Sequence, residues 1–130
     1  MSLDPTNLDR SYLFGRLLAL AEQVERSSYT RGEIYRLRSD RLRPFFLRRP
    51  YEAWNVLYRA LPNRFMRLSP GMRAFYYYMI QDITTVLPYP DDPTLNLPLD
   101  EGNYLCGYNE QRAALCADQP VLAGVIRHNL

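Results

Sequence analysis

Ten prolines divide this chain of 130 residues into segments that are each about one helix long. A proline inside a helix removes a backbone hydrogen bond and clashes with the preceding turn, whereas the first turn tolerates it well. Pro44, Pro62 and Pro88 are therefore predicted to end helices, and Pro50 and Pro70 to lie in first turns. Apolar residues recur between these points at the three- and four-residue spacing of helices, so the sequence predicts an all-α fold.

The first predicted helix covers residues 8–26, and it carries Leu13, Leu17 and Leu20 on one apolar stripe. Neighbouring apolar residues widen this stripe, so the helix is expected to be largely buried. Gly15 lies in its middle, where glycine is about 1 kcal/mol less favourable than alanine. This glycine is therefore predicted to mark a close contact with another helix.

The second predicted helix begins at Thr30 and Glu33, whose spacing fits a capping box that satisfies free backbone N–H groups. It is expected to carry Ile34 inward and to end at Pro44. The third helix is predicted to run from Pro50 to just before Pro62. Its buried stripe is expected to consist of Tyr51, Trp54, Tyr58 and Leu61.

The fourth helix is predicted to start at Ser69 and Pro70, an N-cap residue followed by proline in the first turn. It is expected to end at Pro88. Of the three consecutive tyrosines at 76–78, at least one should reach the surface, because they point three ways around a helix. The inward residues are expected to be Met72, Phe75 or Tyr76, Met79, Ile80, Ile83 and Val86.

A proline-rich connection over residues 88–98 is expected to be irregular and to run over the surface. The last long helix then begins near Asp100, since negative charge is favoured in a first turn, and runs to about Ala117. Asp118 and Pro120 could open a short sixth helix. The prediction is thus a single all-α domain over residues 1–130, a bundle of five helices or six.

Side chains that usually carry catalysis or hold metals are scarce in this sequence. His128 lies near the chain end and is a poor general base, and one histidine with Cys106 and Cys116 makes no zinc site of ordinary spacing. Ten helical residues would separate the cysteines by about 15 Å, too far for a disulfide, so they are predicted to be small apolar fillers. Asp91 and Asp92 are expected to be solvated loop residues. We therefore expect no enzyme, no cofactor and no metal.

The chain also lacks the signatures of a membrane or secreted protein. No window holds 18 consecutive apolar residues, as a bilayer-spanning helix would need. The first residues show neither the basic nor the apolar block of a secretory signal. A cytoplasmic location is expected.

Arginine is distributed very unevenly along the chain, which contains no lysine. Residues 26–73 hold twelve arginines and three acids, a balance of +9. The segments before and after this block have balances of −2 and −5. A field of one sign concentrated in one third of a chain is the footprint of a polyanion partner, although a solvated face or an acidic protein partner stays open.

Two segments, one near each end of the chain, resemble a known family. Residues 11–23, SYLFGRLLALAEQ, and 100–115, DEGNYLCGYNEQRAAL, are similar to the C-terminal region of the large subunit of the type I-C CRISPR surveillance complex, Cascade. The first motif, aromatic-x-x-Gly-Arg-Leu, is matched by Tyr12, Gly15, Arg16 and Leu17. The second, Gly-Tyr-Tyr-His-Gln-Arg, is matched by Gly107, Tyr108, Gln111 and Arg112, whereas Asn109 and Glu110 depart from it.

The resemblance implies a helical, non-catalytic small subunit. In type I-C systems this region is also made as a free protein from an internal start codon, and a chain that begins with methionine just before its first helix looks like that product. Its implied partners are the Cascade backbone subunits, the large subunit, other copies of itself, target and non-target DNA, and the guide RNA (crRNA). Its implied location is the cytoplasm of a prokaryotic cell.

Clustering and resemblance together predict a sequence-independent phosphate groove. Arginine suits this role because its planar group can grip a phosphate through two hydrogen bonds. Phe45 and Phe46 lie within the same block and could stack on bases, but such a pair more often belongs to a core. The predicted nucleic-acid-binding residues are Arg36, Arg38, Arg41, Arg43, Arg48, Arg49, Arg64 and Arg67.

Two other functions stay open at this point. A free-standing helical adaptor could offer the basic face to an acidic protein partner. A sequence-specific helix-turn-helix regulator ranks below it, because residues 30–62 contain only Asn55 as a base-reading amide.

Overall fold

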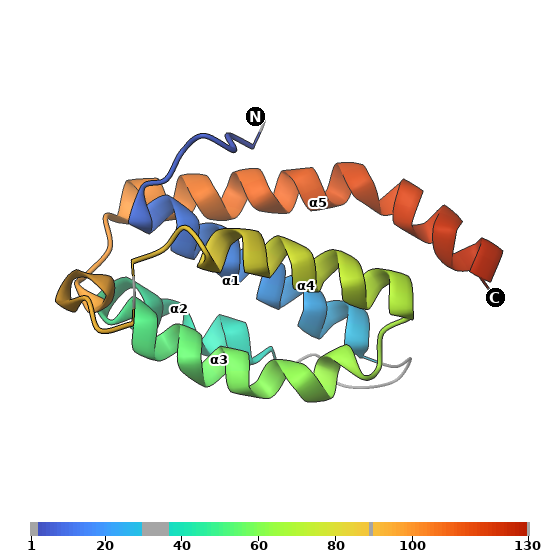
Figure 1. Cartoon of the computed structure of the whole chain (residues 1–130), viewed down its shortest axis with the longest axis horizontal. Helices are drawn as coiled ribbons and strands as arrows, with labels where there is room; N and C mark the ends of the chain where they lie inside the picture. The colour runs from blue at the N-terminus through green and yellow to red at the C-terminus, as the bar shows by residue number, and fades with distance from the viewer. Residues whose placement is uncertain (1–2, 30–36, 89, 130) are drawn as a thin grey trace.

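Five α-helices and one 3₁₀ helix make up the regular structure of the computed structural model (Figure 1). The structure describes residues 3–29, 37–88 and 90–129, with side chains as far as Cys116. In chain order the elements are α1 (Arg10–Ser28), α2 (Arg38–Arg48), α3 (Pro50–Phe65), α4 (Pro70–Thr84), η1 (Pro93–Asn96) and α5 (Glu101–Asn129). The described ranges contain no strand, so the predicted all-α bundle is confirmed. In those ranges, no helix combines the length and the apolar character needed to cross a membrane.

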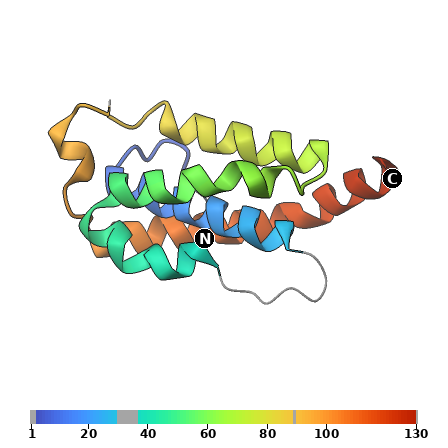
Figure 2. The same cartoon turned by 90° about the horizontal axis from the view of Figure 1, so that it is seen from below.

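The first helix, α1, forms the centre of the bundle (Figures 1 and 2). It contacts α2, α3, α4 and α5, and fourteen of its nineteen residues are buried. Leu13, Leu17 and Leu20 are each at most 1% exposed, as the apolar stripe predicts. Asp9 caps the helix by accepting a hydrogen bond from the Tyr12 N–H at 3.0 Å.

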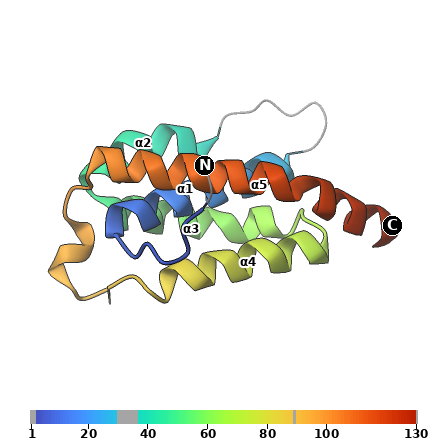
Figure 3. The ribbon, with the colours of Figure 1, turned by 90° about the horizontal axis from the view of Figure 1, so that it is seen from above.

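Two glycines bring α1 and α5 into backbone contact, and the helices run side by side in the same direction (Figure 3). A Cβ added at Gly15 would overlap the carbonyl oxygen of Tyr104. A Cβ added at Gly107 would overlap the carbonyl oxygen of Tyr12. The close helix contact predicted at Gly15 is therefore confirmed, and Gly107 supplies the other half of it.

The prediction that Pro44 and Pro62 end helices is wrong. Pro44 lies inside α2 and Pro62 inside α3. Both prolines are exposed, so water can reach the backbone carbonyl that each leaves without a helical donor. Beyond Pro44, the fully buried Phe46 holds the helix to the core. The predicted capping box and the inward Ile34 lie outside the described residues.

The predicted buried stripe of α3 is wrong at Tyr58, which is 42% exposed. Tyr51 is only half-buried. Ala53 and Leu57 occupy the core instead, beside the expected Trp54 and Leu61.

In α4 the predicted cap is confirmed, since the Ser69 hydroxyl accepts a hydrogen bond from the Met72 N–H at 3.4 Å. The helix ends at Thr84 rather than Pro88, which leaves Val86 exposed beyond it. Tyr77 and Tyr78 reach the surface, as expected for consecutive tyrosines.

The last helix, α5, is a single element that continues through Asp118 and Pro120, so the separate sixth helix is not observed. Cys106 and Cys116 are unpaired, as their predicted separation requires. Both are exposed, so the prediction that they fill the core is wrong. The connection before α5 contains the short helix η1, whose Leu95 is buried.

Candidate nucleic-acid interface

The start of α2 is fixed by a carboxylate from α1. Leu37 stands at the N-cap position and offers no side-chain hydrogen bond. Instead, the two carboxylate oxygens of Glu25 accept the backbone N–H groups of Arg38 and Ser39 at 2.8 and 2.9 Å. Glu25 is only 3% exposed, so this buried anion satisfies the free donors and the positive end of the helix dipole. These bonds fix the start of α2 against α1.

A groove of about 500 Å³ opens along α2 and α3, and we call it the basic groove. Among the described lining residues, Val56 and Ala60 are apolar and Asn63 is the one neutral polar side chain. Glu25 is the one acid that the structure describes in this lining. Its five arginines are Arg38, Arg41, Arg59, Arg64 and Arg67.

Three of the five arginines of the basic groove have no acid partner among the described residues. Arg38, Arg41 and Arg59 are exposed and make no ion pair within the described residues. Arg64 lies 4.6 Å from the ring centroid of Tyr29, a cation–π contact rather than a pairing with an acid. The one lining carboxylate, Glu25, is already bound to the start of α2. Five guanidinium groups around one groove repel one another, and a bound polyanion would relieve that repulsion.

Four of the predicted binding residues line this groove together, namely Arg38, Arg41, Arg64 and Arg67. Arg36 lies outside the described residues. Sequence reasoning missed Arg59, although this residue belongs to the same arginine block.

Arg43 turns away from the groove and into a buried network. One of its terminal nitrogens lies 3.1 Å from Glu22 Oε2 and also donates to the Tyr108 hydroxyl. The guanidinium carbon lies 4.4 Å from the centroid of the Tyr108 ring. Tyr108 in turn donates to the same Glu22 oxygen at 2.7 Å, and Arg26 approaches the other oxygen at 3.3 Å. Arg43 therefore joins α2 to both α1 and α5.

The electrostatics of this network agree with a structural role. Burial alone would lower the pKa of Arg43, but its hydrogen bond to Glu22 and its electrostatic interactions with Tyr108 and Glu22 outweigh that effect and raise the pKa. Burial raises the pKa of Tyr108 and of Tyr104, so both phenols stay protonated to higher pH than in water. Arg43 is thus held as a permanent cation beside a buried carboxylate.

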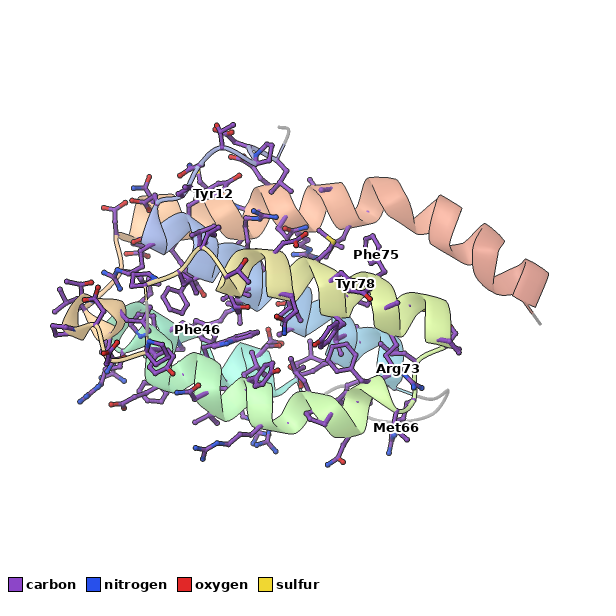
Figure 4. The ribbon with its side chains drawn as sticks, in the orientation of Figure 1. Tyr12, Phe46, Met66, Arg73, Phe75 and Tyr78 are labelled. Atoms are coloured by element: carbon purple, nitrogen blue, oxygen red, sulfur yellow. The ribbon has the colours of Figure 1, made fainter. Side chains whose placement is uncertain are left out.

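The remaining predicted residues lie at the other end of α2. Arg48 is exposed but does not line the groove. Arg49 pairs with Glu52, with 2.6 Å between Nη2 and Oε1. Phe46 is fully buried and Phe45 packs partly buried against the core, which confirms the core alternative for this pair (Figure 4). Within the described ranges no cluster of acids, cysteines or histidines could hold a metal ion.

Comparison with known protein families identifies the chain. A family model described as CRISPR-associated protein (Cas_Csd1) matches residues 1–116. The chain belongs to the Csd1 family. Membership indicates a CRISPR-associated protein of the Cascade type, in agreement with the resemblance of the two end segments. No curated protein was found to match the chain.

In this Csd1-family chain, the motif residues that carried the resemblance lie at the contact between α1 and α5. Gly15 and Gly107 are the two close-contact glycines. Arg16 donates from Nε to Gln111 Oε1 at 2.8 Å, and Gln111 is completely buried. The arginines of the basic groove lie instead on α2, on α3 and in the turn after α3, and all of the described lining residues fall within the matched range.

Proposed function

We propose that this chain is a non-catalytic small subunit of a type I-C Cascade complex. In this role it binds the phosphate backbone of the guide–target duplex and of the displaced non-target strand, which together form the R-loop. The observation that carries the proposal is the basic groove, whose described lining holds five arginines and one carboxylate, and that carboxylate is already engaged. Membership of the Csd1 family supports the Cascade assignment.

The composition of the basic groove favours backbone contact over base reading. Among the described lining residues there is no aromatic ring, and Asn63 is the one amide. Guanidinium groups can hold phosphates through paired hydrogen bonds without regard to the bases. In a guide-directed complex, base pairing with the guide supplies sequence specificity, so a subunit that grips only phosphates is sufficient.

The charge distribution of the chain also bears on its proposed protein partners. The segment after residue 73 has a balance of −5, opposite to that of the arginine block. In the proposed complex this acidic part faces basic surfaces of backbone subunits, the large subunit or further copies of the chain. Such contacts act over short range only, because exposed charges are screened beyond about 8 Å at physiological salt.

The decisive experiment measures target-DNA binding by the guide-loaded complex assembled with and without this chain. Omission is expected to weaken binding of duplex DNA much more than of a pre-melted target, because only the duplex must be opened and held open. If omission changes neither, the small-subunit function is wrong, and an adaptor with an acidic protein partner takes its place.

The salt dependence of binding tests the groove itself. For the isolated chain on single-stranded DNA, about four phosphate contacts predict a slope of log K against log salt near −3, from about −0.7 per phosphate. Changing Arg38→Gln, Arg41→Gln and Arg59→Gln together is expected to flatten this slope by about 2. The matched control is Arg48→Gln with Arg49→Gln, which removes two exposed charges outside the groove and is expected to leave most of the slope.

A further inference from the structure

A second groove, of about 490 Å³, opens between α3 and α4 near the turn that joins them. Figure 4 shows Met66, in the turn after α3, and Arg73, on α4, at that end of the bundle. Its lining is mainly apolar and includes four aromatic rings. We call it the aromatic groove, and its rings belong to Tyr58, Phe65, Tyr77 and Tyr78.

Three of the four aromatic side chains of this groove are exposed to solvent. Tyr58, Tyr77 and Tyr78 are 42%, 47% and 65% exposed. Much of each of these side chains is therefore accessible to solvent. Tyr77 and Tyr78 pack edge to face, with 75° between their ring planes, so they offer two separate apolar ring surfaces to planar ligands.

The aromatic groove is also positively charged. Arg73 lines it, and this side chain donates to the carbonyl oxygens of Phe65 and Leu68 at 3.1 and 3.2 Å. These bonds tie the guanidinium to the turn between α3 and α4 and hold its charge in place. Among the described lining residues there is no aspartate or glutamate. An acid-free groove with a fixed cation favours a ligand that carries negative charge.

Both grooves share α3. Tyr58 and Phe65 line the aromatic groove on one flank of this helix, while Arg59, Ala60 and Asn63 line the basic groove on the other. The two grooves are therefore separated by about the width of one helix with its side chains, about 10–12 Å. A nucleic-acid strand held in the basic groove needs to cross only this one helix to meet the aromatic rings.

We propose that the aromatic groove binds unstacked bases of a single strand whose phosphates lie in the basic groove. This inference rests on the proposed function, since it takes the basic groove as a phosphate site. Aromatic rings beside a cationic channel are the combination by which proteins hold single strands without sequence preference, because every base offers a π-face. Bases paired within a duplex are not free to stack on these rings. The aromatic groove thus makes the chain selective for single strands.

The test uses the full chain and single-stranded oligothymidine, compared with an abasic oligomer of equal length and charge. The intact oligomer is expected to bind about tenfold more tightly or better. In the double variant Tyr77→Leu with Tyr78→Leu, this advantage should disappear while the salt slope stays unchanged. Leucine keeps the apolar character and the helix propensity. The variant Tyr77→Phe with Tyr78→Phe keeps the rings and should retain the advantage.

A fluorescent base reports the contact directly. When 2-aminopurine replaces a thymine, the proposal expects its emission to be quenched on binding, and quenching should be lost in the leucine variant. Equal affinity for intact and abasic strands with a steep salt slope would overturn the aromatic-groove proposal but leave the proposed function standing. A flat salt slope would instead overturn the proposed function. If the leucine substitutions lower the sedimenting mass and leave base dependence intact, the groove joins copies of the chain and the proposal is wrong.

Discussion

Arginine serves opposite purposes on the two sides of α2. Toward α1 and α5, Arg43 meets the buried Glu22 carboxylate and the ring of Tyr108, so its charge is matched within the fold. Toward α3, Arg38 and Arg41 face three further arginines and a single engaged carboxylate. A charge paired with a buried acid holds the bundle together, whereas exposed guanidinium groups without an acid partner among the described residues, such as those of Arg38 and Arg41, indicate an external partner. The number of arginines in a segment is therefore less informative than the presence of an acid within reach of each.

The largest expected loss of stability comes from disrupting the close contact between α1 and α5. Gly15→Ala should lower the free energy of unfolding by about 3 kcal/mol or more, because the new Cβ overlaps a backbone carbonyl that cannot move aside as a side chain can. Urea denaturation followed by circular dichroism measures the loss.

Gly102→Ala is the matched control for this experiment. Gly102 also lies in α5, but an added Cβ would meet only the Asp100 carboxylate at 3.5 Å, an ordinary contact. Its stability should be unchanged or higher by up to about 1 kcal/mol, since alanine favours helix. Equal losses in the two variants would mean that α1 and α5 are not in close contact at Gly15.

A smaller loss of stability should distinguish Arg43, which is paired with a buried acid, from the exposed Arg41 on the same helix. Arg43→Met should destabilise the chain by about 1.5–3 kcal/mol, because a buried carboxylate loses a charged hydrogen-bond partner. Arg41→Met should change stability by no more than about 0.5 kcal/mol, since its side chain is exposed and unpaired within the described residues. Thermal unfolding measures both changes.

The same two variants should rank in the reverse order in DNA binding. Arg41→Met is expected to weaken single-strand binding and to flatten its salt slope by about 0.7, while Arg43→Met leaves the slope of the folded chain unaltered. If both variants lost binding equally, the distinction between paired and unpaired arginines would have no functional meaning.

The smallest expected effect concerns Tyr104, whose buried hydroxyl has no hydrogen-bond partner among the described residues. Burial raises its pKa above the ordinary 10.0, so the unfolded chain releases this proton at lower pH than the folded chain does. Its contribution to stability is therefore complete below pH 10 and is lost as the pH rises through the folded-state value.

Tyr104→Phe removes this titration and an unsatisfied polar atom together. Its unfolding free energy at pH 7 should equal or exceed that of the unchanged chain by up to about 1 kcal/mol. Above pH 10 its stability should fall less steeply with pH, as urea melts at pH 8, 10 and 11 would measure. A steeper decline in the variant would contradict this account.

Local sequence patterns predicted the helices well where nearby side chains determine which face is buried or where the helix starts. The stripe of α1 and the cap at Ser69 follow from short-range rules, and both are observed. The same short-range rules wrongly predicted that Pro44 and Pro62 end helices. Each proline lies on an exposed face, where water can replace the missing helical donor. Proline therefore need not end a helix where water can reach the backbone carbonyl that is left without a donor.

The site was only partly predictable, because clustering in sequence does not determine orientation. Arg41 and Arg43 are two residues apart, which places them about 200° apart around a helix. Which of them faces inward depends on Glu22 and Tyr108, which are 21 and 65 residues away from Arg43. Arg59 was missed for a related reason, since only the placement of α3 beside α2 brings it into the groove.

The contact between α1 and α5 has a consequence for how the chain is made. The hydrogen bonds from Tyr12 to Glu110 and from Arg16 to Gln111 join residues 98 and 95 positions apart. Closing so long a loop costs conformational entropy before any native contact is gained, and topologies rich in distant contacts fold slowly. On the ribosome, α1 emerges before the other four α-helices and lacks its main partner until α5 has been synthesised. We therefore expect the central helix to depend on transient protection, by neighbouring helices or by chaperones, until the last helix arrives.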